Sequence, residues 1–122
     1  MEVLTSFIQE TSSADNNEGE NQSSILTPIQ AAITVIGRRN FSQDPKDKKL
    51  DLSNAKLAKA NLKGAYLQGA ILQNIDLIKA NLENTNLREA NLENAYIGGA
   101  YLGEANLSQA NLKEAIAILF HS

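Results

Sequence analysis

The sequence has no cysteine and no tryptophan, and it has only one histidine and two prolines in 122 residues. Without cysteine the fold cannot depend on disulfides, and a reducing compartment suits it. No apolar run reaches the roughly 18 residues that a membrane-spanning helix needs, so no membrane partner is expected. The N-terminus has too few apolar residues for a secretory signal, and the expected location is the cytoplasm.

Catalysis has little support in the residue types that are present. His121, the single histidine, stands one residue from the end, so a histidine-based triad or metal cluster cannot be assembled. The carboxylates of the repeats are spread over outward positions of different units rather than gathered together, at Asp51, Asp76, Glu83, Glu89, Glu93, Glu104 and Glu114. The sequence therefore predicts a protein that is not an enzyme and has no cofactor or metal site.

What the sequence does contain is a period of five residues, repeated thirteen times without an insertion from Leu50 to Glu114. An aliphatic residue stands at the centre of each unit, and the residue two places earlier is usually alanine. Neither an α-helix nor a flat strand keeps a stripe of this period on one side. The predicted core consists of the thirteen central residues: Leu52, Leu57, Leu62, Leu67, Leu72, Leu77, Leu82, Leu87, Leu92, Ile97, Leu102, Leu107 and Leu112.

Two inward positions in every five predict a coil with short walls. The two positions are separated by one residue, so they share a face of an extended segment, and the remaining residues turn the chain. Asparagine, aspartate and glycine suit the bends because they tolerate turn conformations. Coils joined by parallel backbone bonds would stack about 4.8 Å apart.

Several units resemble the A-(D/N)-L-x-x motif of the pentapeptide repeat family. They include A-N-L-K-G at 60–64, A-N-L-E-N at 80–84 and A-N-L-S-Q at 105–109, and the resemblance covers residues 50–114. It implies a right-handed quadrilateral β-helix with four pentapeptides in each coil. The predicted fold class is therefore an all-β solenoid of this kind with a short N-terminal capping helix.

The chain before the repeats divides into three segments. Residues 1–10 are a candidate short helix, and residues 11–24 are interpreted as a flexible polar linker because they have little to bury. Residues 25–49 are a capping helix and its connection, in which Thr27 can cap the helix and Pro28 can occupy its first turn. We expect its apolar stripe to cover the open N-terminal end of the solenoid. The segments M-E-V-L-T-S-F-I at 1–8, I-Q-A-A-I-T-V-I-G-R-R at 29–39 and D-P-K-D-K-K-L-D-L-S at 44–53 resemble a leading region found in a bacterial, largely cyanobacterial, subset of the family.

The C-terminal end changes character. The repeat solenoid is expected to span residues 50–119, with a tail at 120–122, and the outward positions become apolar in the segment A-I-A-I-L-F at 115–120. One interpretation is a cap that folds over the last coil. The other is a self-association surface that makes a homodimer through this end.

Side chains twenty residues apart should stack in one outward column. The least charged face places Ala58, Ile78, Gly98 and Ile118 beside Lys56, Asp76, Tyr96 and Ile116. This face is expected to receive a partner or the chain's own N-terminal helix. A column of Asn54, Asn74 and Asn94 is interpreted as structural. The candidate interface residues are Ile78, Tyr96, Ile116, Ile118, Leu119 and Phe120.

The charge balance bears on partners. Residues 50–119 contain six basic and seven acidic side chains, so direct nucleic-acid binding is not expected. Some members of the family resemble duplex DNA and protect DNA gyrase from quinolones. The near-neutral charge and a length of about 16 Å argue against such mimicry here.

We expect a non-enzymatic protein-protein interaction or scaffolding module whose protein partner is unknown. The alternative is a DNA-mimic regulator of a nucleic-acid enzyme such as DNA gyrase. A third hypothesis, a truncated relic without a role of its own, is motivated by the start of the chain inside the leading region.

Overall fold

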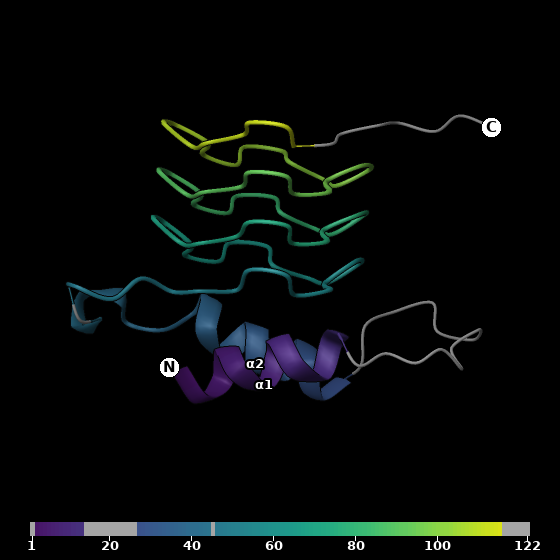
Figure 1. Ribbon diagram of the computed structural model, residues 1–122. Coiled ribbons are helices and arrows are strands. Elements are labelled where there is room, and N and C mark those ends of the chain that lie inside the picture. The colour runs from purple at the N-terminus through teal and green to yellow at the C-terminus, as the bar shows by residue number, and fades with distance from the viewer. Residues whose placement is uncertain (1, 14–26, 45, 116–122) are drawn as a thin grey trace.

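The computed structural model describes residues 2–13, 27–44 and 46–115, which form helices below a stack of coils (Figure 1). Helix α1 spans Glu2–Ser13, helix α2 spans Thr27–Gly37, and the short 3₁₀ helix η2 spans Phe41–Gln43. Among these residues no helix is long and apolar enough to cross a membrane.

The coils repeat every twenty residues. Each backbone bridge joins a residue to the one twenty positions later in parallel register, as Asp51 is joined to Ile71. The N–H of Leu52 donates to the carbonyl of Ile71 at 2.9 Å, and the N–H of Ile71 donates to the carbonyl of Leu50 at 2.8 Å. Four pentapeptides therefore make one coil of a β-helix.

The walls of this β-helix are single bridges rather than continuous strands. Each wall contributes one bridging residue before the chain turns again, so the described part of the chain has no strand in the usual sense. The prediction of a β-helix with an N-terminal helix is confirmed, but continuous strands are absent from the described residues because the parallel ladder is broken at every corner. Two α-helices precede the coils, at the candidate short helix and at the predicted capping helix.

Each pentapeptide ends in a tight turn. The carbonyl of the central residue accepts a hydrogen bond from the N–H three residues later, as between Leu52 and Ala55 at 3.2 Å. The second residue after each centre has a positive φ, which is the signature of a type II turn. Glycine and asparagine fill seven of these bends, but the other six hold Lys59, Lys79, Glu89, Glu104, Gln109 and Glu114. The prediction of asparagine, aspartate and glycine at the bends therefore covers only some of them. The type II turn places lysine, glutamate and glutamine in the left-handed conformation as well.

The central residues and the alanines before them fill the interior. From Leu52 to Leu92 every central residue is at most 3% exposed. Toward the C-terminal end burial falls, and Leu112 is 40% exposed. Residues 116–122 lie outside the described chain, so the place of Leu112 in the core stays a prediction.

One interior position is polar. Thr85 stands where most repeats have alanine, and it is 1% exposed. Its hydroxyl donates to the carbonyl of Leu62 at 2.8 Å, so the buried oxygen is satisfied.

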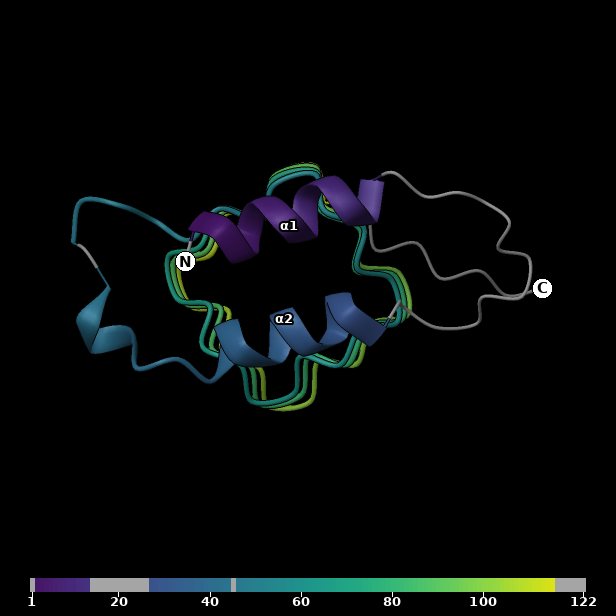
Figure 2. The same ribbon diagram turned by 90° about the horizontal axis from the view of Figure 1, so that it is seen from below.

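Helices α1 and α2 lie side by side below the first coil (Figure 2). Their buried residues, including Ile8, Ile33 and Ile36, join the same apolar cluster as the first coil. Helix α2 thus lies at the N-terminal end of the tube and leaves the wall of Ile78 and Tyr96 uncovered. A Cβ on Gly37 would come within 2.8 Å of the Ala65 Cβ, so glycine permits this close approach.

Helix α1 is longer than the sequence indicates. It runs to Ser13, so residues 11–13 belong to the helix and not to a linker. The remainder of the predicted linker, residues 14–24, lies outside the described residues.

Candidate functional site

The helices close the N-terminal end by bonding to backbone groups that face away from the second coil. The Gln9 Nε2 donates to the carbonyl of Ser53 at 3.0 Å. The Gln30 Nε2 donates to the carbonyl of Asn61 at 2.9 Å, while its Oε1 accepts from the Asn61 N–H at 2.9 Å. These two amides replace part of the bonding that a preceding coil would supply, so the edge of the first coil is protected.

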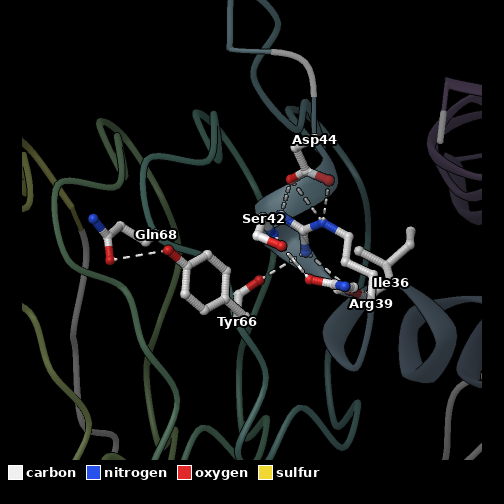
Figure 3. Close-up of polar contacts among 7 residues, drawn as sticks. Ile36, Arg39, Ser42, Asp44, Tyr66 and Gln68 are labelled. Carbon is white, nitrogen blue, oxygen red and sulfur yellow. Dashed lines mark hydrogen bonds and ion pairs between the residues drawn. The ribbon is translucent and has the colours of Figure 1, made fainter.

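A cluster around Arg39 fastens the connection after α2 to the first coil (Figure 3). The Arg39 Nη1 donates to the carbonyls of Ile36 and Tyr66, each at 2.9 Å. Its Nη2 pairs with the Asp44 carboxylate at 2.9 Å, and the Arg39 side chain is only 8% exposed. Buried guanidinium groups are stable only when their donors are bonded, as they are here.

The Tyr66 ring extends this cluster. It stacks on Phe41 with 3.6 Å between ring centroids, and its hydroxyl donates to the Gln68 Oε1 at 3.2 Å. The Arg39 guanidinium carbon lies 5.7 Å from the ring centroid. Sequence reasoning did not find this cluster. The available signals were the arginine and aspartate five residues apart and an aromatic residue between them, and these do not indicate which wall they meet.

Asparagine residues just before the central leucines have a local structural role. The Oδ1 of Asn61, for example, accepts from the N–H of Lys63 at 3.1 Å, and Asn81 bonds in the same way to Glu83 at 3.0 Å. The separate column of Asn54, Asn74 and Asn94 occupies bends with positive φ. Their positions are those of turn residues, in line with the structural interpretation.

The described residues offer no group of three metal-ligating side chains close enough to hold an ion. A shallow cleft of about 160 Å³ lies between α2 and the first coil, and Thr34, Arg38 and Lys63 are among its lining residues. Among the described residues that line this cleft, none is acidic and none is histidine.

The wall formed by residues 56–60, 76–80 and 96–100 carries exposed apolar side chains, and we call it the Ile78 wall. Ile78 is 38% exposed and Tyr96 is 44% exposed. Tyr101, which the sequence did not single out, begins the next wall and is 61% exposed. The other candidate interface residues, Ile116, Ile118, Leu119 and Phe120, lie outside the described residues.

Comparison with known proteins identifies the repeats. Residues 49–84 and 85–117 match the pentapeptide repeats in eight copies. No curated protein matches the chain. Among solved structures the chain is similar to a pentapeptide repeat protein of the Arabidopsis thaliana thylakoid lumen, at 34% identity and a TM-score of 0.32, over 51% of this chain and 50% of that one.

Two cyanobacterial pentapeptide repeat proteins are also similar. The protein from Cyanothece 51142 is 33% identical with a TM-score of 0.24, over 62% of this chain and 64% of that one. The protein from Nostoc Pcc 7120 is 36% identical with a TM-score of 0.23, over 55% of this chain and 64% of that one. In each case this chain covers less than two thirds of the solved structure. Because the family match spans more than half of the sequence and coincides with the twenty-residue coils, this chain belongs to the pentapeptide repeat family.

Proposed function

We propose that this chain is a non-enzymatic interaction or scaffolding module that docks another protein on the Ile78 wall. The observation that supports this proposal is the exposure of Ile78 and Tyr96 on a wall that neither helix covers. Apolar and aromatic residues gathered on an exposed surface are typical of protein interfaces. The backbone bonds between coils hold the backbone of this wall in place, so little ordering of the backbone is needed on binding.

The charges of the wall indicate the kind of partner. Lys59 and Lys79 occupy bends at one corner of the Ile78 wall, and both are exposed. A partner that presents apolar residues to Ile78 and carboxylates to this corner would complement both features.

The alternative of DNA mimicry requires carboxylates stacked in successive coils, as phosphates are stacked along a duplex. No outward column of the described repeats holds more than one carboxylate. The column of Glu93, for example, contains Ser53, Gln73 and Lys113. This distribution argues against imitation of DNA and for docking of a protein surface.

Two further points belong to the proposal. We expect the coils to wind to the right, which is the preferred hand of connections between parallel extended segments. We also expect the C-terminal end to mediate self-association, because Leu112 there is 40% exposed.

The docking proposal can be tested with a photoreactive amino acid placed at Ile78. Arg88 holds the same position within its repeat on the opposite wall and is the matched control. In lysate of the native host, the probe at position 78 should cross-link a defined protein that the probe at position 88 does not capture. Replacing Tyr96 with serine should reduce that cross-link. The same products at both positions, or none at either, would reject the Ile78 wall as the docking site.

A further inference from the structure

The cleft between α2 and the first coil has two cations in its lining. Arg38 lines it from the end of α2, Lys63 lines it from the facing wall of the coil, and both residues are exposed. Among the described residues, neither side chain has an ion pair or a hydrogen bond. Because none of the described lining residues is acidic, the two positive charges favour an anionic ligand.

The same cleft has an unused backbone acceptor, the carbonyl of Lys63. In the second coil the carbonyl at this position, that of Glu83, accepts from the Gly64 N–H at 2.8 Å. In the third coil the Gly103 carbonyl accepts from the Asn84 N–H at 2.9 Å. The Lys63 carbonyl faces α2 instead of a preceding coil, and no described residue donates to it. A ligand in the cleft can therefore supply the missing N–H.

The backbone groups on either side of this acceptor are already bonded. The Gln30 side chain bonds to both the N–H and the carbonyl of Asn61. At the next corner the Tyr66 N–H donates to the Gly37 carbonyl, and the Tyr66 carbonyl accepts from Arg39. One free carbonyl remains between them, so this edge has room for a single amide group and not for a whole strand.

The nearby carboxylates do not neutralise the cleft. Glu83 is the next residue in the outward column of the cleft's lysine, but its side chain leans toward the third coil. There its Oε2 lies 3.8 Å from the place that a Cβ on Gly103 would take. The Asp44 carboxylate is paired with Arg39. Helix α1, which carries Glu10, bonds to the opposite wall of the first coil.

The end of α2 is also compatible with an anion. Free carbonyls at the C-terminus of a helix repel negative charge. Here the Thr34 carbonyl accepts from the Arg38 N–H at 3.1 Å, and the Ile36 carbonyl accepts from the Arg39 N–H at 3.3 Å and from its Nη1 at 2.9 Å. These donors offset the partial negative charge at the end of the helix.

We propose that this cleft binds the carboxyl end of a peptide chain. The terminal carboxylate pairs with Arg38 and Lys63, and the N–H of the last peptide residue donates to the Lys63 carbonyl. The cleft of about 160 Å³ exceeds several times over the roughly 30 Å³ that one water molecule occupies in the liquid, so a carboxylate and its adjoining amide fit. The cleft is on a different wall from Ile78, so this inference goes beyond the docking proposal.

The test uses three small probes and the full-length protein labelled with ¹⁵N. N-acetylglycine has both the amide N–H and the carboxylate, acetate has only the carboxylate, and N-acetylglycinamide has only amide groups. N-acetylglycine should shift the NMR signals of the Arg38 Nε–H and of the Lys63 and Gly64 amides, with a dissociation constant on the order of 1–10 mM. Acetate and N-acetylglycinamide should each bind at least about fivefold more weakly, because each lacks one of the two interactions.

Two variants locate the probe. Arg38→Gln and Lys63→Gln should each weaken the binding of N-acetylglycine at least about fivefold. Both residues are exposed, so circular dichroism should show folded protein. Lys113→Gln is the matched control, because Lys113 stands in the same A-N-L-K sequence as Lys63 but does not line the cleft. Its affinity for N-acetylglycine should equal that of the wild type.

Three results would overturn the inference. Equal affinities for acetate and N-acetylglycine would mean that the cleft takes any small anion and does not recognise a peptide end. Signals that stay unchanged at about 50 mM N-acetylglycine would mean that the cleft binds no such group. Binding that is the same in wild type, Arg38→Gln and Lys63→Gln would place the probe elsewhere. The cross-linking test of the Ile78 wall is independent of all three results.

Discussion

The first and last coils have the same repeat but very different surroundings. Leu52 and Leu112 are both central leucines, yet Leu52 is 1% exposed and Leu112 is 40% exposed. Leu52 lies between the helix pair and the second coil, whereas Leu112 has a described neighbour on one side only. Burial in a solenoid is thus conferred by adjacent layers, and the local sequence supplies only the direction in which a side chain points.

Of the three changes considered, a carboxylate at the centre of the tube should lower the free energy of unfolding most, and the loss should be much larger in a middle coil than in the last one. Leu82→Asp should lower the free energy of unfolding by several kcal/mol, because an unpaired carboxylate would stand in an aliphatic interior. Leu112→Asp should lower it by less than about 1 kcal/mol, since that position is open to water. Urea unfolding followed by circular dichroism measures both. The outward change Glu83→Gln is the control and should be nearly silent. Equal losses for the two aspartate variants would contradict the assignment of inside and outside.

Loosening the helical cap should make the N-terminal end resemble the C-terminal end. Arg39→Met removes the bonds to Ile36, Tyr66 and Asp44, and a loss of about 1–3 kcal/mol is expected because the guanidinium is nearly buried. Hydrogen exchange at the Tyr66 N–H, which bonds to the carbonyl of Gly37 at 3.1 Å, should become faster. Arg38→Met is the matched control at an exposed neighbour. Exchange at Tyr66 that stays slow in Arg39→Met would show that the cap holds without the arginine.

Substitution of a bend residue by glycine should change stability by the same small amount in the first and last coils, and this is the smallest of the three predicted effects. Lys59 and Glu114 have φ values of 66° and 57° in the first and last coils. Glycine adopts a positive φ without the steric cost that lysine and glutamate have there, but glycine loses more backbone entropy on folding. Because the two effects oppose each other, each substitution by glycine should raise the free energy of unfolding by at most about 1 kcal/mol. Thermal unfolding of Lys59→Gly and Glu114→Gly provides the measurement. A large gain at one end and none at the other would mean that the strain of the bend depends on its neighbours.

The sequence predicts the coil well because one property, side-chain size, repeats at a fixed interval. The central leucines and the alanines before them determine which positions face inward, and the twenty-residue register follows once four units are taken as one coil. The bends at Lys59 and Glu89 could not be read in this way. Their left-handed conformation belongs to the type II turn that ends every described repeat, whichever residue stands in the bend.

The cap was harder to foresee than the coil. The apolar spacing in residues 27–37 indicates a helix and residues 1–10 are a candidate helix, but the bonds of Gln9 and Gln30 to the edge have no repeating signal. Each glutamine bonds to the backbone of a residue more than thirty positions away. Such contacts depend on how the helices rest on the tube, which local pattern does not encode.

The twenty-residue register also constrains how this molecule can change in length. Inserting one pentapeptide between Ile78 and Tyr96 would preserve the interior, yet it would move every later repeat to the next wall and so place Tyr96 on a different wall from Ile78. Inserting four pentapeptides would add one full coil and leave each later side chain on its original wall. An insertion of five residues therefore changes which side chains share a wall, whereas an insertion of twenty residues keeps them together.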